Sequence, residues 1–143
     1  MTILRASWWG TILFAATSAG AVAVPEPPFE VPAFAVAVGL FLAGCVIFVL
    51  AYSQAVQKSR ERVIGVAQLF FLTGEAAPPD VKRSLLGAFA LQVAVALGAA
   101  IARPYSSLAA GTLTPLYGLA LCGLWAARYG TFPPRQPETK KKR

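Results

Sequence analysis

The sequence predicts an all-α integral membrane protein, a four-helix bundle with both termini on the cytoplasmic side (N-in/C-in). The first observation behind this prediction is composition. Hydrophobic residues make up 57 % of the 143 residues and charged residues only 13 %, whereas soluble domains carry about 25 % charged residues. A soluble monomer could not cover so much apolar surface, so this composition excludes soluble domains and, outside the C-terminal tail, disordered chains.

The second observation is a set of four long apolar runs. A transmembrane helix needs about 20 mostly apolar residues, and a helix satisfies its own backbone hydrogen bonds in lipid. We therefore expect a single membrane domain over residues 1–130, with a cytoplasmic loop at 54–83 and a basic, disordered tail at 131–143. The expected spans cover residues 8–24, 32–53, 84–102 and 108–128.

The third observation is the distribution of charge. Twelve of the 13 basic residues lie before the first run, in the 54–83 loop, or from Arg128 onwards. Arg103 is the exception, and the loop after the first run carries only Glu26 and Glu30. The positive-inside rule then places both termini and the 54–83 loop in the cytoplasm.

The N-terminal half leaves two alternatives open. Arg5, the first apolar run and the small residues 21–23 also fit a signal peptide, whose removal would leave three spans in the same orientation. Residues 25–32 contain four prolines, so we expect a stiff extended link there. This link is either a simple connection or a docking surface for a partner on the outer face.

The cytoplasmic loop contains an apolar run at 63–72 that is too short to span a membrane. We expect a short amphipathic segment that lies in the membrane interface, covers the bundle end or docks on another subunit. Anionic lipids on the cytoplasmic face are expected partners, and nucleic acid is not, because the cations lie in gaps between apolar runs. The candidate headgroup contacts are Lys58, Arg60, Arg62, Lys140, Lys141, Lys142 and Arg143.

Small residues recur every four positions in each run, and such stripes allow helices to approach closely in lipid. We expect them either to pack the bundle or to form an oligomer face. The stripes are Ala15/Ala19/Ala23, Ala35/Gly39/Ala43, Ala90/Ala94/Gly98/Ala102 and Gly118/Cys122/Ala126. Pro115 lies inside the fourth run, where we expect a kink.

The chain offers little chemistry. It has no His and no Asn, its two cysteines form no CxxC motif, and the four runs hold no Asp, Glu, Lys or Arg before their ends. We therefore expect no enzyme activity, no cofactor and no metal. Two polar residues remain as candidate packing or ligand contacts. Gln92 forms an interhelical hydrogen bond or touches a ligand, and Arg103 anchors the interface or binds a lipid phosphate, Glu26 or Glu30.

Residues 103–105 (RPY), 123–125 (GLW) and 127–135 (ARYGTFPPR) resemble small uncharacterised multi-pass membrane proteins of actinobacteria, over the latter half of the chain. This resemblance implies a bacterial plasma (inner) membrane and carries no activity or site residue with it.

These patterns indicate a non-catalytic integral membrane protein, an accessory or assembly subunit of a larger bacterial membrane complex. The expected partners are other membrane subunits or further copies of the chain. The alternative is a small homo-oligomeric transporter, channel or lipid-handling protein.

Overall fold

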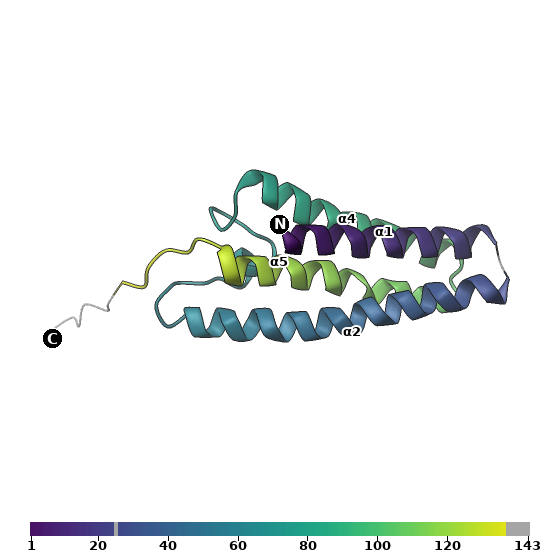
Figure 1. Cartoon of the computed structure of the whole chain (residues 1–143), viewed down its shortest axis with the longest axis horizontal. Helices are drawn as coiled ribbons and strands as arrows, with labels where there is room; N and C mark the ends of the chain where they lie inside the picture. Colours follow the sequence, from purple (N-terminus) through teal and green to yellow (C-terminus); the bar gives the residue numbers. More distant parts are fainter. Residues whose placement is uncertain (25, 137–143) are drawn as a thin grey trace.

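The computed structural model describes residues 1–24 and 26–136 and has four long helical segments aligned along one axis (Figure 1). The first three are α1 (Thr2–Ala23), α2 (Pro27–Lys58) and α4 (Pro79–Ala102). The fourth consists of a 3₁₀ helix, η1 (Ser107–Leu113), followed by α5 (Pro115–Tyr129), and a short α3 (Val66–Phe70) precedes α4. The predicted helical class is confirmed.

Three of these segments are long and apolar enough to cross a membrane: Pro27–Lys58, Pro79–Ala102 and Ser107–Tyr129. The remaining segment, α1, has 22 residues, which would span about 33 Å at 1.5 Å per residue. Its Ser, Thr and Trp residues lower its mean hydropathy, so α1 is not among the segments that are apolar enough to cross a membrane by this measure.

The segments form two parallel pairs that pack antiparallel to each other. Helix α1 runs beside α4, and α2 runs beside α5 (Figure 1). A hydrogen bond from Trp8 Nε1 to Ser84 Oγ (2.9 Å) joins the first pair near the start of both helices. The chain start, the α2–α4 connection and the end of α5 therefore share one end, which we call the basic end. The α1–α2 and α4–η1 connections share the far end.

The helices extend beyond the predicted spans. Helix α1 begins at Thr2, so Arg5 lies in its first turns, and α2 begins at Pro27 and not at Pro32. The expected extended link over 25–32 is thus wrong from Pro27 onwards. Prolines are tolerated in the first turn because the N–H groups there have no partner within the helix, and Pro32 removes only one further hydrogen bond.

The apolar run at 63–72 covers the bundle end, one of the three predicted roles. Leu69, Phe70 and Leu72 are buried. The ring of Phe70 stacks on that of Phe48 in α2 with centroids 4.8 Å apart. Leu72 adopts a left-handed backbone conformation with φ of 52°, which returns the chain towards α4 after its side chain has entered the core.

Residues 131–136 correct the prediction that the disordered tail begins at 131. The Val63 N–H donates to the Pro133 carbonyl and the Arg135 N–H donates to the Glu61 carbonyl, both at 2.9 Å. Phe132 is buried against the core. Backbone pairing of this kind does not depend on side-chain type, which is why the proline-rich composition did not reveal it. We call the paired segments 59–63 and 131–135 the clasp.

The small-residue stripes are only partly used for packing. The stripe Gly118/Cys122/Ala126 is buried, whereas Ala90, Ala94, Gly98 and Ala102 of α4 are all exposed. Helix α4 instead buries its opposite face, which carries Leu85, Ala88, Gln92, Ala96 and Ala99. Lipid and protein interior are equally apolar, so residue size does not tell the two faces of such a helix apart.

The closest packing lies at mid-height, around Tyr117. A Cβ atom at Gly44 of α2 would approach the backbone nitrogen of Tyr117 to 2.8 Å, and one at Gly10 of α1 would overlap the tyrosine ring. These two glycines let α1 and α2 both reach α5, so α1 is in direct contact with α5 at this level.

We expect Gly44→Val to destabilise the bundle by about 1–3 kcal/mol, the usual range for overpacking, because the opposing atoms are backbone atoms that cannot rotate away. Unfolding in mixed micelles measures this loss. Gly39→Val is the matched control, since a Cβ at Gly39 on the same helix meets nothing within 4 Å. Equal stability of the two variants would contradict the packing described here.

Candidate functional site

The centre of the bundle contains a polar cluster built around Gln92. This side chain is fully buried. Its Nε2 donates to Thr11 Oγ1 at 2.7 Å, and its Oε1 accepts from the Gly118 N–H at 3.1 Å. The Thr11 hydroxyl in turn donates to the Ser7 carbonyl at 2.7 Å. Gln92 thus joins α1, α4 and α5, and its predicted interhelical hydrogen bond is confirmed.

The Gly118 N–H is available because the fourth segment is broken. The first N–H groups of a helix have no partner within that helix. Helix α5 starts in the middle of the bundle at Pro115, directly after the 3₁₀ turn, and the Tyr117 N–H bonds back to Thr114. The expected kink at Pro115 is therefore a change of helix type, and Gln92 satisfies a donor that this change leaves free.

Two further hydroxyl groups border the cluster. Ser7 Oγ and Thr114 Oγ1 are buried and make no hydrogen bond to the residues that the structure describes. Tyr117 Oη donates to the Ala6 carbonyl at 2.9 Å. These groups are neutral donors and acceptors, so the cluster orders helices and offers no acid–base or nucleophilic pair.

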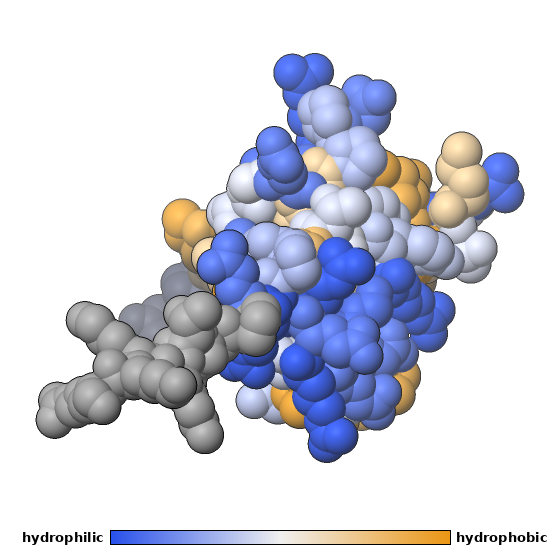
Figure 2. Space-filling model, turned by 90° about the vertical axis from the view of Figure 1, so that its left-hand side faces the viewer, coloured by the Kyte–Doolittle hydropathy of each residue, from blue (hydrophilic) through white to orange (hydrophobic). Residues whose placement is uncertain are grey.

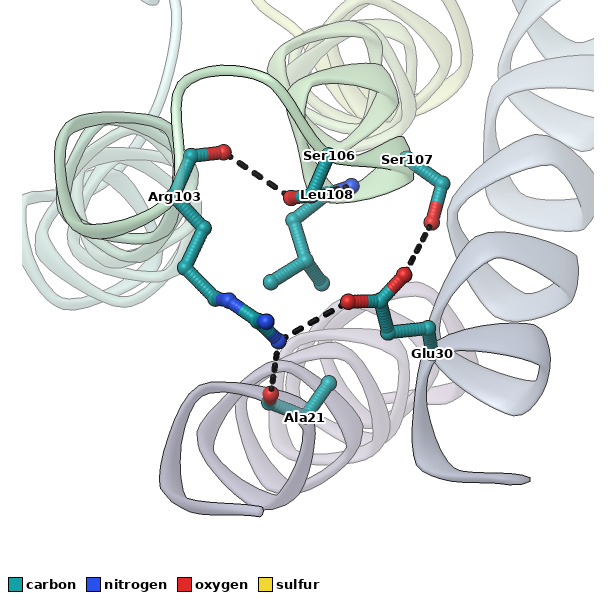
Figure 3. Close-up of polar contacts among 6 residues, drawn as sticks. All are labelled: Ala21, Glu30, Arg103, Ser106, Ser107 and Leu108. Atoms are coloured by element: carbon teal, nitrogen blue, oxygen red, sulfur yellow. Dashed lines mark hydrogen bonds and ion pairs between the residues drawn. The ribbon is translucent and has the colours of Figure 1, made fainter. Parts of the chain in front are cut away.

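At the far end, Arg103 and Glu30 form an ion pair (Figure 3). Arg103 Nη1 lies 2.8 Å from Glu30 Oε1 and donates to the Ala21 carbonyl at 3.1 Å. Glu30 Oε2 also accepts from Ser107 Oγ at 3.4 Å, while Ser106 Oγ donates to the Arg103 carbonyl. The predicted contact of Arg103 with an outer acidic residue is confirmed for Glu30. It joins the ends of α1, α2, α4 and η1.

The surface of the basic end is largely hydrophilic (Figure 2). Within residues 1–24 and 26–136, no acidic side chain here forms an ion pair with a cation. Several cations donate instead to carbonyl groups of the clasp and of the α5 end. The bonds are Lys58 Nζ to Arg128 O (3.2 Å), Arg62 Nη1 to Phe132 O (2.8 Å) and Arg135 Nη1 to Ser59 O (3.2 Å).

The predicted headgroup contacts therefore differ in the hydrogen bonds that they make. Arg62 bonds to a carbonyl group of the clasp, and Lys58 bonds to a carbonyl group at the end of α5. Arg60 is exposed, and its guanidinium makes no hydrogen bond or ion pair to the described residues. Lys140, Lys141, Lys142 and Arg143 lie outside the described residues.

Sequence reasoning missed the partners of Gln92 and the role of Tyr117. Thr11 lies at a similar depth to Gln92 if both runs start at the same membrane face, and this was an available signal. The hydrogen bond from the Gly118 N–H to Gln92 Oε1 depends on the residue at which α5 begins. Pro115 was the only sequence signal for that position. In the described residues, no three metal-ligating side chains come together, and Cys45 and Cys122 are both free.

We expect Gln92→Leu to lower the free energy of unfolding by about 1–3 kcal/mol, since it leaves the Gly118 N–H buried without an acceptor. Unfolding in mixed micelles measures the loss. Thr17→Val is the control, because the Thr17 hydroxyl bonds only to carbonyls of its own helix. A Gln92→Leu variant as stable as the wild type would contradict the bridging role.

The ion pair at the far end is partly exposed, so we expect a coupling energy of only about 0.5 kcal/mol from a Glu30→Gln/Arg103→Gln double-mutant cycle. This coupling should fall when salt is added, because salt screens exposed charges. The same cycle with Glu26→Gln in place of Glu30→Gln serves as control. A coupling that is equal in both cycles would show that Arg103 feels the general charge of the far end and not Glu30.

No protein-family profile, curated protein or solved structure matches this chain. The resemblance to actinobacterial membrane proteins therefore stays a prediction. Function has to be argued from the residues of this chain.

Proposed function

We propose that this chain is a non-catalytic, four-span protein of a bacterial plasma membrane, with both termini in the cytoplasm, that serves as an accessory or assembly subunit of a larger membrane complex. The observation that carries the proposal is the filled interior of the bundle. Gln92 bonds to both Thr11 and Gly118, and Gly10, Gly44 and Gly118 allow close contacts with Tyr117 and Gln92 at mid-height.

The charge distribution supports the proposed orientation. Arg103 is the only cation at the far end among the described residues, and Glu30 neutralises it. The basic end carries Arg5, Lys58, Arg60, Arg62, Lys82, Arg83, Arg128 and Arg135. Positive residues in short loops are retained on the cytoplasmic side. The packing of α1 around Gly10 supports its role as the fourth span.

The filled interior argues against a pore within one copy. Gly10 and Gly44 bring α1 and α2 against Tyr117, and Gly118 lies so close to Gln92 that an added Cβ would be 2.6 Å from its Oε1. Transport usually relies on ionisable groups inside the membrane, and the central cluster has neutral amide and hydroxyl groups in their place.

The exposed stripe on α4 supports a partner helix. Ala90, Ala94, Gly98 and Ala102 form a smooth outward face, and small residues are where helices meet closely in lipid. The groups needed for folding lie on the opposite face of α4, around Gln92. Helix α4 can therefore hold its own bundle together with one face and receive another subunit on the other.

One observation favours the alternative, a homo-oligomeric transporter. The break at Thr114–Pro115 starts a helix in the middle of the bundle, and transporters often bind substrates at such broken helices. Here Gln92 of the same chain already occupies the Gly118 N–H at this helix start, which is why the accessory role ranks first.

The test is purification of the tagged protein from its native membrane in mild detergent, followed by native mass spectrometry. We expect a stoichiometric heteromeric complex that Gly98→Phe disrupts, because a large side chain would prevent close approach at the stripe. Leu97→Phe is the matched control, since Leu97 is exposed on α4 beside the stripe. A defined homo-oligomer would favour transport, and a lone monomer would overturn both functions.

A further inference from the structure

We propose that the basic end holds a specific site for an anionic phospholipid, with an acyl chain in a groove between α2 and α3 and the phosphate on Arg60. The groove has a volume of about 430 Å³, and its lining includes Phe48, Val56, Ser59, Val66 and Phe70. Its volume falls within the range of about 300–1,000 Å³ found for ligand sites. The proposal does not depend on the accessory role.

The shape of the groove fits a chain. Along α2 and its C-cap residue, the groove extends from Phe48 to Ser59, which is about 16 Å at 1.5 Å per residue. The stacked rings of Phe48 and Phe70 form its inner end, and the exposed side chains of Val56 and Val66 form its two rims. The walls are almost entirely apolar, as an acyl chain requires.

A cation follows one end of the groove in the sequence. Ser59, the residue after α2, lines the groove, and Arg60 is the next residue. In the part of the chain that the structure describes, the guanidinium of Arg60 has no acceptor. The neighbouring cations Lys58 and Arg62 bond to neutral carbonyl groups and form no ion pair with the described residues. Glu61 is the acidic residue between them, so segment 58–62 keeps a net positive charge. The complementary occupant is therefore a chain that ends in a negative group.

Charge, and not the apolar walls, must supply the selectivity. An acyl chain that moves from the bilayer into the groove exchanges one apolar environment for another, so there is no hydrophobic gain to distinguish lipids. A cation near the membrane surface does attract anionic headgroups. We therefore expect the site to discriminate by headgroup, and we expect the groove to keep the lipid bound when the bilayer is replaced by detergent.

The experiment is native mass spectrometry of the full chain in detergent. Phosphatidylglycerol or phosphatidylcholine with the same acyl chains is added at 150 mM salt, and the lipid retained after mild activation is counted. We expect one phosphatidylglycerol to be retained in preference to phosphatidylcholine. Arg60→Gln should lower this preference about fivefold, the equivalent of one cation near the surface. Val56→Trp should fill the groove and abolish retention of both lipids.

Matched controls keep the test specific. Val49→Trp adds the same side chain at an exposed position of α2 outside the groove, and Arg83→Gln removes an exposed cation of the same end. Both should behave as the wild type, and thermal unfolding confirms that each variant is folded.

Three results would overturn the proposal. The first is equal retention of the two lipids, and the second is equal loss for Arg60→Gln and Arg83→Gln, which would show diffuse attraction. The third is a Val56→Trp variant that retains lipid but loses a co-purified protein, which would assign the groove to a partner segment.

Discussion

In a lipid bilayer, every buried backbone group needs a partner within the protein, because no water is present to supply one. The fourth segment of this chain breaks that rule locally by starting a new helix at Pro115, in the middle of the bundle. Gln92 restores the balance by accepting from the Gly118 N–H and donating to Thr11. This one amide links α1, α4 and α5 at mid-height.

The same level of the bundle is also where the helices come closest. An amide that reaches two other helices needs short distances, and Gly10, Gly44 and Gly118 provide them around Tyr117. Polar bridging and small-residue packing are therefore coupled here. Without the Gln92 side chain, the Gly118 N–H at the break in the fourth segment would have no acceptor. Without the glycines, this N–H would lie too far from Gln92.

The sequence predicted the class of fold well and the surfaces less well. Apolar runs and the distribution of cations are long-range properties that depend on the solvent. The sequence therefore predicted the helical class, and it predicted that Arg5, the 54–83 loop and Arg128 lie at the same end of the bundle. The inward face of α4 was not, because Ala88 and Ala90 differ in neither size nor polarity. The start of α2 was missed because proline has two opposite effects. It breaks a helix when it lies in the interior, but it is favoured in the first turn of a helix.

The candidate site shows the same division. Gln92 and Arg103 were identifiable as isolated polar residues in apolar surroundings, and one predicted role of each, the interhelical bond and the contact with Glu30, is confirmed. Arg60 makes no hydrogen bond or ion pair within residues 1–24 and 26–136, and the sequence did not distinguish it from Lys58 and Arg62. The pairing of the clasp segments decides which cation bonds to a carbonyl group. These segments are 70 residues apart, and composition does not indicate backbone pairing between them.

The clasp also sets an order of events during synthesis. Segment 59–63 leaves the ribosome long before Pro133 and Arg135, with which it pairs. At about 5–20 residues per second, this interval amounts to several seconds. During that time the end of α2 and the α3 segment can sample the membrane surface without their backbone partner. The two halves of the chain are thus locked together only after all four long segments have been translated, which leaves their relative arrangement adjustable until the last.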